Sequence, residues 1–232
     1  MKKLIIEKEK LVENINAIKN DINCPVIGVV KGDGYGLGLI PYAAVLKENG
    51  IEHFAVSESC EALSLSENGF PNILLMSPEN NPDMLNQLIE NDIILTIGSL
   101  QTLDIICNLQ TEKKPKVHLK IDTGFGRFGF YYKNIDQIAS DFECETIMIE
   151  GIFSHFSCSF EKKYHITKLQ NQRFEQVLQE LKNRGLSARF VHLANSCAAL
   201  RFPETHHNAV RIGSAFLGRL PVPVSIKLNR IG

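Results

Sequence analysis

Apolar and polar positions follow two distinct rhythms along this chain. Short runs that are apolar almost throughout alternate with longer segments in which apolar residues recur at helical spacing. The first such segment, residues 8–20, places Leu11, Ile15 and Ile18 on one face and is predicted to be an amphipathic helix. Strands that are apolar throughout are typical of a sheet covered on both faces. The pattern predicts strands at residues 25–30, 53–56, 72–76, 93–97, 117–121, 146–153, 189–193 and 208–212.

The segments between the predicted strands have the character of helices. Several of them end at a glycine, which is typical of a helix carboxyl terminus. They are predicted at residues 41–49, 58–68, 83–90, 99–108, 135–141 and 163–184. Strands that alternate with helices over short connections predict a single (β/α)8 TIM barrel with parallel strands over residues 1–232. A doubly wound α/β sheet is the lesser alternative.

The composition of the chain argues against several classes of binding partner. The chain has 232 residues and a net charge of −1 with no basic stripe, which argues against nucleic acid. It contains no run approaching the ~18 apolar residues of a membrane span. Its first apolar run, after Lys3, is too short for a signal peptide, so a cytoplasmic protein is expected. The six cysteines are scattered without a C-x-x-C pair, which predicts reduced thiols and no structural zinc.

The segment 29–36, Val-Val-Lys-Gly-Asp-Gly-Tyr-Gly, follows the first predicted strand. In a barrel of this kind the carboxyl ends of the strands carry the active site, so Lys31 would point towards it. A lysine in that place either extends along an apolar surface to reach water or takes part in chemistry. The glycines allow positive φ or the close approach of a ligand to the backbone.

Polar residues and glycines also follow the later predicted strands. Arg211, Gly213 and Ser214 offer backbone N–H groups at the start of a helical turn, and Ser196 can add a hydroxyl, which together suit a phosphate. A lysine facing a phosphate site suggests an imine with a phosphorylated aldehyde, which is pyridoxal phosphate. On spacing alone, a barrel that binds a sugar phosphate remains open. The other residues at strand ends are Lys120 with segment 122–129, Ser154, His155, His192 and Asn195.

These motifs resemble, in order, those of the alanine racemases. Residues 29–38 resemble the family's lysine motif for pyridoxal phosphate. Residues 120–129 resemble its Lys-x-Asp-Thr-Gly-Met-Gly-Arg-x-Gly motif, with Phe125 in place of methionine. Residues 154–156, 192–196 and 211–213 match the later motifs. The resemblance implies a fold-type III enzyme that uses pyridoxal phosphate to interconvert L- and D-alanine, a small-molecule substrate, for the cell wall.

The resemblance also implies roles for individual residues. Lys31 would bind the cofactor covalently and then act as a base, Arg127 would contact the substrate carboxylate, and Lys120 would be carbamylated. Arg211 would face the pyridine nitrogen. Because a guanidinium does not readily give up a proton, the ring would remain a weak electron sink, which favours racemisation over transamination. The expected catalytic residues are Lys31, Arg127, His155 and Arg211. The expected cofactor-binding residues are Lys31, Tyr35, His155, His192, Asn195, Ser196, Arg211, Gly213 and Ser214.

The sequence also departs from the family pattern. Racemisation in the family uses a tyrosine from a C-terminal β-domain of the partner subunit in a homodimer, and this sequence stops at Gly232, where that domain is expected to start. The chain is therefore expected to be the barrel of a longer enzyme and to racemise little by itself. Segment 32–34 and Phe160 replace an Ala-Asn-Ala and an aspartate, so serine, ornithine or another amino acid could be the substrate. A non-catalytic barrel for pyridoxal phosphate homeostasis and a fold-type III decarboxylase are the rival interpretations.

Overall fold

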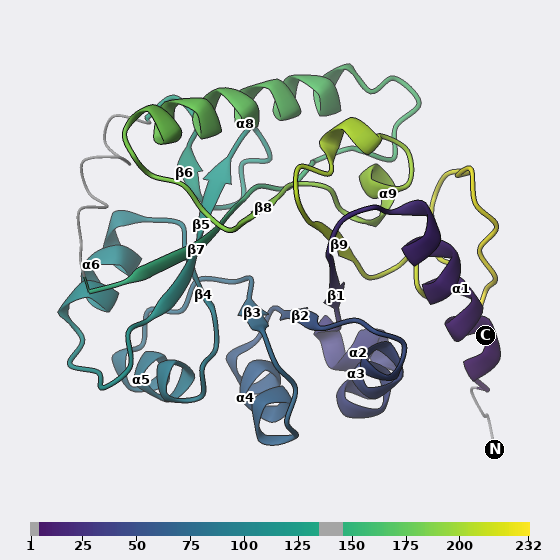
Figure 1. Ribbon diagram of the computed structural model, residues 1–232, viewed down its shortest axis with the longest axis horizontal. Coiled ribbons are helices and arrows are strands. Elements are labelled where there is room, and N and C mark those ends of the chain that lie inside the picture. The colour runs from purple at the N-terminus through teal and green to yellow at the C-terminus, as the bar shows by residue number, and fades with distance from the viewer. Residues whose placement is uncertain (1–4, 135–145) are drawn as a thin grey trace.

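The computed structural model describes residues 5–134 and 146–232 and shows eight parallel strands around one barrel (Figure 1). Two sheets, with strand orders β3-β2-β1-β9 and β4-β5-β7-β8, make up its wall. Single bridges, Leu74 to Ile94 and His192 to Ala209, join the sheets at their two seams. The barrel strands are β1 (Val26–Val29), β2 (His53–Val56), β3 (Ile73–Leu75), β4 (Leu95–Ile97), β5 (Lys116–Asp122), β7 (Met148–Phe153), β8 (Phe190–His192) and β9 (Val210–Ile212). The predicted parallel barrel is thus confirmed.

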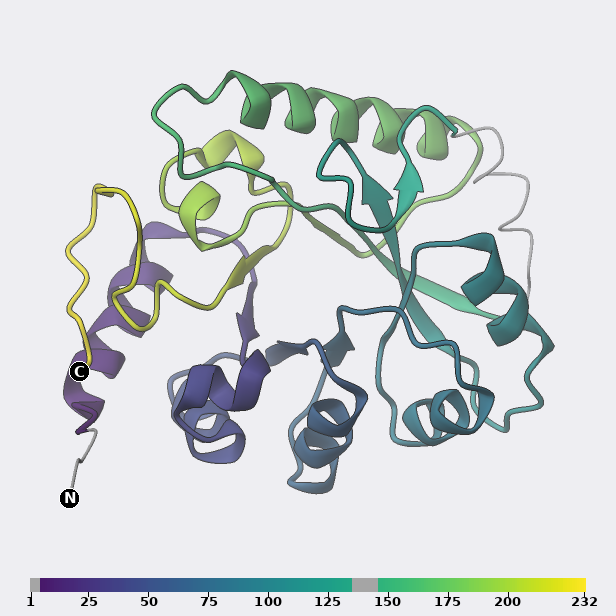
Figure 2. The same cartoon turned by 180° about the vertical axis from the view of Figure 1, so that it is seen from behind.

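Helices surround the barrel in both views (Figures 1 and 2). The long helix α8 crosses one side, and the others lie around the remaining circumference. They are α1 (Lys8–Asp21), α2 (Lys31–Gly36), α3 (Leu39–Glu48), α4 (Ser59–Glu67), α5 (Pro82–Glu90), α6 (Leu100–Asn108), α8 (His165–Asn183), α9 (Ser196–Ala199) and the 3₁₀ turn η1 (Pro203–Thr205). The helix predicted at residues 135–141 lies outside the described residues. Four short elements were not predicted: α2, α9, η1 and the strand β6 (Phe130–Tyr131), which pairs with β5.

The two halves of the barrel contribute different side chains. One apolar cluster, which includes Phe190 and Ala209, draws Ile27, Val29, Ala55, Leu74 and Ile94 from or beside β1 to β4. Strands β5, β8 and β9 instead bring four buried polar side chains, which are His118, Lys120, His192 and Arg211. The strand register pairs Lys120 with Phe153 and Phe153 with His192, which sets these side chains side by side. Burying polar groups is costly unless they are hydrogen-bonded, so this half is the natural place to look for function.

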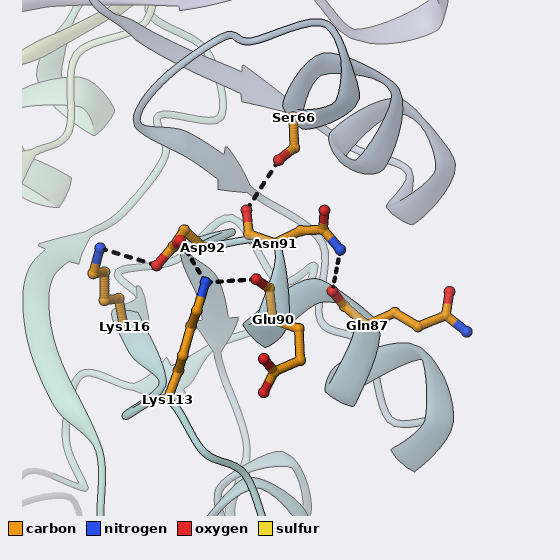
Figure 3. A network of polar contacts seen from close by, with 7 residues as sticks. All are labelled: Ser66, Gln87, Glu90, Asn91, Asp92, Lys113 and Lys116. Carbon is orange, nitrogen blue, oxygen red and sulfur yellow. Dashed lines mark hydrogen bonds and ion pairs between the residues drawn. The ribbon is translucent and has the colours of Figure 1, made fainter.

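A polar network ties helices α4 and α5 to the amino-terminal end of β5 (Figure 3). Lys113 Nζ donates to Glu90 O at 2.6 Å and to Asp92 Oδ2 at 2.7 Å, and Lys116 Nζ lies 3.7 Å from Asp92 Oδ1. Ser66 Oγ donates to Asn91 O at 3.1 Å. Ion pairs as exposed as these contribute little to stability, so the network serves chiefly to fix the turn between α5 and β4.

The carboxyl-terminal segment lies along α1 (Figures 1 and 2). Asn14, which is fully buried, donates from Nδ2 to Phe216 O at 2.9 Å and to Asn229 O at 2.7 Å, and its Oδ1 accepts from Asn229 N–H at 2.7 Å. Among the described residues, no helix is both long and apolar enough to span a membrane. Four cysteines are free thiols, as expected, but Cys107 is disulfide-bonded, which the scattered spacing did not predict.

Candidate active site at the carboxyl ends of the strands

A cavity of about 400 Å³ opens at the carboxyl ends of the strands, within the size range of small-molecule sites. Nine of the eleven residues predicted for the site line it. They are Lys31, Tyr35, Arg127, His155, Asn195, Ser196, Arg211, Gly213 and Ser214. The other two, Lys120 and His192, are buried and contact residues that line it. Apolar residues that the sequence did not single out complete the wall, among them Met76, Phe128 and Phe153.

The backbone after β1 forms a left-handed turn. Gly32, Asp33, Gly34 and Tyr35 have φ values of +65°, +50°, +62° and +58°. This conformation costs a non-glycine residue roughly 1–2 kcal/mol, so glycine at alternate positions halves the number of strained residues. Positive φ at the glycines confirms the sequence interpretation, whereas the left-handed Asp33 and Tyr35 were not foreseen.

Local hydrogen bonds hold Asp33 in its strained conformation. The Asp33 N–H donates to Glu61 Oε1 at 2.9 Å, and Asp33 Oδ1 accepts from the Leu39 N–H at 2.8 Å, which is the capping role expected of an aspartate in such a turn. The turn reverses the chain so that Tyr35, four residues after Lys31, faces the loop after β9. Burial raises the pKa of Tyr35 to about 12, so its hydroxyl stays protonated and can donate.

Tyr35, Ser196 and Gly213 form one end of the cavity. A Cβ added at Gly213 would overlap the Tyr35 hydroxyl and lie 2.8 Å from its Cζ, so only glycine fits there. Ser196 Oγ accepts from the Gly213 N–H at 2.9 Å and from the Ala215 N–H at 3.4 Å. A turn of successive i→i+3 hydrogen bonds follows, with Phe216 N–H donating to Gly213 O at 3.1 Å. Hydroxyls and backbone N–H groups gathered in this way suit a phosphate.

Asn195 stabilises the loops around the Tyr35 end of the cavity. Its Oδ1 accepts from the Ala198 N–H at 3.1 Å, which caps α9, and from Ser159 Oγ at 2.9 Å. Arg201 Nη1 donates to the carbonyl oxygens of Ser159 and, at 3.0 Å, of Glu161. Asn195 therefore joins the loop after β8 to the loop after β7.

Arg211 is a deeply buried cation of the site, with 3% of its surface exposed. Nη1 contacts His192 Nδ1 and donates to His192 O at 3.0 Å. Nη2 donates to the carbonyl oxygens of Ser154 at 2.7 Å and Leu193 at 3.2 Å, and it lies 3.1 Å from His155 Nδ1. None of these five contacts is with a carboxylate. Burial lowers the pKa of Arg211 to about 9, so the guanidinium still carries its charge at neutral pH.

Lys120 lies beneath the cavity, and its amine is only partly protonated near neutral pH. Nζ donates to Ile121 O at 2.8 Å and sits 5.5 Å from the ring centroid of Phe128 and 5.6 Å from that of Phe153. Burial, and next the charge of Arg211, lower the pKa of Lys120 to about 7. A substantial fraction of this amine is therefore neutral, and nucleophilic, near physiological pH.

Arg127 and its loop form the opposite wall. The guanidinium lies over Phe125 at 4.7 Å and Phe128 at 5.4 Å, which orients it by cation–π contact. Asp122 Oδ1 accepts from the N–H groups of Gly124 at 2.9 Å and Phe125 at 2.8 Å. Local capping of this kind is common for an aspartate in a glycine-rich turn, and it leaves Arg127 without an acidic partner within the loop.

The histidines of the site are neutral and connected. Burial, and next Arg211, hold the pKa of His155 and of His192 well below the usual range. His192 Nε2 lies 2.9 Å from His118 Nδ1. His118, which belongs to none of the sequence motifs, is buried beside the site. Its spacing of two from Lys120 within one predicted strand could have revealed that the two side chains share a face.

The charges of the cavity are strongly unbalanced. Lys31, Arg127 and Arg211 line it, and no aspartate or glutamate of the described residues does so. A buried cation without an acidic partner favours an anionic ligand. The residues therefore fit a small aromatic or polar molecule that carries a phosphate at the Tyr35 end, with Lys31 within the same cavity.

Comparisons with known proteins agree with this geometry. The sequence model of the family described as "Alanine racemase, N-terminal domain" matches residues 6–221. The alanine racemase of Methanococcus maripaludis is 33% identical over 90% of this chain and 59% of its own length, and that of Clostridium tetani is 34% identical over 93% and 57%. The chain thus spans a little over half the length of these relatives.

Solved structures give the same result. Alanine racemase from Clostridium difficile 630 in complex with cycloserine superposes with a TM-score of 0.89 at 28% identity, covering 97% of this chain and 65% of that protein. Alanine racemase from Bacillus anthracis with bound L-Ala-P gives 0.90 at 31% identity, covering 97% and 61%. This chain belongs to the alanine racemase family and corresponds to its N-terminal barrel domain.

Proposed function

We propose that this chain binds pyridoxal phosphate through Lys31 and is the cofactor-binding barrel of a racemase for alanine or a similarly small amino acid. The observation that carries the proposal is the cavity with three cations and no acidic residue among the described lining residues, with a phosphate-sized cup at one end. The family resemblance adds D-alanine for the cell wall as the product and a homodimer as the working form. When bound, pyridoxal phosphate supplies an aldehyde that condenses with amines and a ring that draws electrons from the α-carbon of an amino acid.

The cup would hold the phosphate. Tyr35 keeps its proton and donates from its hydroxyl, and the N–H groups of Gly213 and Ser214 open the turn after β9. Ser196 Oγ now accepts from the Gly213 N–H and can rotate its proton towards an anion. Each such hydrogen bond to a charged group is worth about 1.5–3 kcal/mol.

Each of the three cations of the cavity would have its own role in binding or proton transfer. Arg211 is fixed by its five contacts through Nη1 and Nη2, so it orients a donor towards the ring nitrogen and gives up no proton at neutral pH. Arg127, which contacts the rings of Phe125 and Phe128, would bind the substrate carboxylate. Lys31 Nζ would take up or deliver the proton on one face of the substrate α-carbon.

Lys120 would be carbamylated. Its neutral amine can attack carbon dioxide, forming an N–C bond and releasing one proton, which replaces a buried amine by an anion among Arg127 and Arg211. A carbon-13 carbonate experiment would show a carbamate resonance in the wild type and none in a Lys120→Met variant. A wild-type spectrum without that resonance would refute this part of the proposal.

The binding proposal is tested by trapping the imine. The protein is mixed with pyridoxal phosphate and reduced with borohydride, and its peptides are analysed by mass spectrometry. We expect a visible absorption band and a single labelled lysine, Lys31, with both lost in Lys31→Ala. Lys168→Ala removes an exposed lysine on α8 and serves as the matched control, which should keep the band and the label. A colourless mixture, or a label that persists in Lys31→Ala, would overturn the assignment.

The chemical proposal is tested by proton exchange. Incubating the loaded protein with L-alanine and with D-alanine in deuterated water isolates the step at the α-carbon, which proton NMR follows. Because Lys31 serves one face, we expect exchange in one enantiomer to exceed exchange in the other at least tenfold. Equal and slow exchange in both enantiomers, at the rate of free pyridoxal phosphate, would argue for a carrier of the cofactor instead of a racemase.

A further inference from the structure

A line of three side chains runs from the cavity into the barrel. Arg211 Nη1 contacts His192 Nδ1, and His192 Nε2 lies 2.9 Å from His118 Nδ1. The exposed fractions of Arg211, His192 and His118 are 3%, 0% and 2%. Water therefore does not compete for these contacts, and any hydrogen-bond partner of these nitrogens has to come from the protein.

The guanidinium fixes the position of every proton along this line. A guanidinium can only donate hydrogen bonds, so His192 Nδ1 must accept. Burial keeps both histidines neutral, and it lowers the pKa of His118 to about 3, so each ring has one N–H. That of His192 is on Nε2 and donates to His118 Nδ1, which in turn leaves the His118 proton on Nε2. The opposite arrangement would set two N–H groups against each other at Arg211.

This arrangement of protons leaves His118 with an unfavourable feature, a buried N–H without a hydrogen bond to any described residue. In the described part of the chain its Nε2 has no hydrogen-bond partner, although the atom is buried. The ring is held by packing, with ring centroids 6.1 Å from Phe190 and 5.1 Å from His192. Gly151 makes room for it, because a Cβ there would lie 2.5 Å from the His118 ring. An apolar ring would pack in this space without a buried unpaired N–H, so packing alone does not account for histidine at this position.

We propose that His118 is a positioning residue for Arg211 that acts through His192. By accepting from the His192 Nε2–H, His118 Nδ1 holds His192 in the tautomer whose Nδ1 lone pair faces the guanidinium. Without that acceptor the His192 proton can move to Nδ1, where it repels Arg211 Nη1 and displaces the guanidinium from its carbonyl partners. The consequence for cofactor binding rests on the proposed function, whereas the tautomer itself does not.

Nitrogen-15 NMR of histidine-labelled protein without cofactor tests the tautomer directly. We expect His192 to be protonated at Nε2 and unprotonated at Nδ1 in the wild type. His118→Phe keeps an aromatic ring but removes the acceptor, and we expect it to give His192 with mixed or reversed protonation. His118→Asn places Oδ1 close to the former Nδ1 and should restore the wild-type pattern. A wild-type His192 protonated at Nδ1, or an unchanged His192 in His118→Phe, would overturn the proposal.

Titration of the same proteins with pyridoxal phosphate measures the consequence for Arg211. We expect His118→Phe to weaken binding about tenfold and His118→Asn to stay within about threefold of the wild type. His207→Phe removes a half-buried histidine whose Nε2 contacts Asn171 on α8, and this control should bind as the wild type does. If the wild type shows the expected tautomer but binds no cofactor, the proposed function fails and the positioning role stands. If the wild type binds cofactor and His118→Phe binds equally well, the positioning role fails.

Discussion

Replacing Gly213 by alanine tests the phosphate cup most directly, because the expected effect follows from one steric contact. The added Cβ would lie 2.8 Å from Tyr35 Cζ, whereas ordinary contacts begin at 3.4 Å. The ring must therefore retreat by ~0.6 Å, the difference between these two distances, and the hydroxyl must retreat further. No positive φ is involved at Gly213, so the backbone itself tolerates alanine.

Two magnitudes follow from this displacement. Overpacking of this kind costs about 1–3 kcal/mol of folding stability. If the Tyr35 hydroxyl no longer reaches the phosphate, binding loses about 1.5–3 kcal/mol, which weakens the affinity for pyridoxal phosphate roughly ten- to hundredfold. Spectrophotometric titration measures the affinity, and chemical denaturation measures the stability.

A double-mutant cycle with Tyr35→Phe separates the causes. Removing the hydroxyl alone should weaken binding by a similar factor without overpacking. Gly213→Ala in that background should then add little, because the hydrogen bond it disturbs is already gone. Gly28→Ala, which overpacks against Ile51 and Leu46 away from the cavity, should lower stability and leave the affinity unchanged. Fully additive losses for Gly213→Ala and Tyr35→Phe would refute the account of the cup.

Three further predictions concern the framework of the site. Gly32→Ala, at φ +65° with open space around it, should destabilise the fold by about 1 kcal/mol in urea denaturation, since only the backbone conformation is penalised. Lys120 has a pKa lowered to about 7, so between roughly pH 7 and 10.5 the unfolded chain binds the extra proton and stability should rise with pH. Relative to Lys120→Met, the wild type should gain up to about 1.4 kcal/mol per pH unit in that window, and parallel curves would contradict this. Asp122→Ala should lower stability by about 1–2 kcal/mol by leaving loop N–H groups unsatisfied, while Asp122→Asn should recover most of it in thermal unfolding.

The barrel could be predicted from the sequence because its signals are local. Each strand is a short apolar run, and every connection except the one between residues 193 and 208 carries a helix pattern, so the repeats accumulate before any long-range contact is considered. The cluster of site residues followed from the same logic. Once the strands are placed, the barrel fold brings Lys31, Arg127 and Arg211 to one end, although they are far apart in the sequence.

The features that the sequence did not reveal depend on contacts across the fold. Asp33 is left-handed in a turn that Glu61 and Leu39 hold through hydrogen bonds to it, and neither partner is recognisable from the turn itself. His118 lies between two apolar residues of a strand and resembles a core residue. Its partner His192 is found only when the register of β5, β7 and β8 is known.

Because Arg211 is a buried cation, binding of an anionic ligand in this cavity should stabilise the folded protein. Arg211 is satisfied by carbonyl oxygens and imidazoles alone, and Lys31 and Arg127 share its cavity without an acidic residue among the described lining residues. Removing charge from water is costly unless an opposite charge replaces the lost hydration. A phosphorylated ligand would supply that negative charge. Arg211, whose burial without an acidic partner in the described part of the chain destabilises the fold, would then gain a favourable interaction. A ligand that binds only the folded state stabilises it by mass action, and for this reason the unbalanced cavity favours tight binding of an anion over binding of a neutral molecule of the same shape.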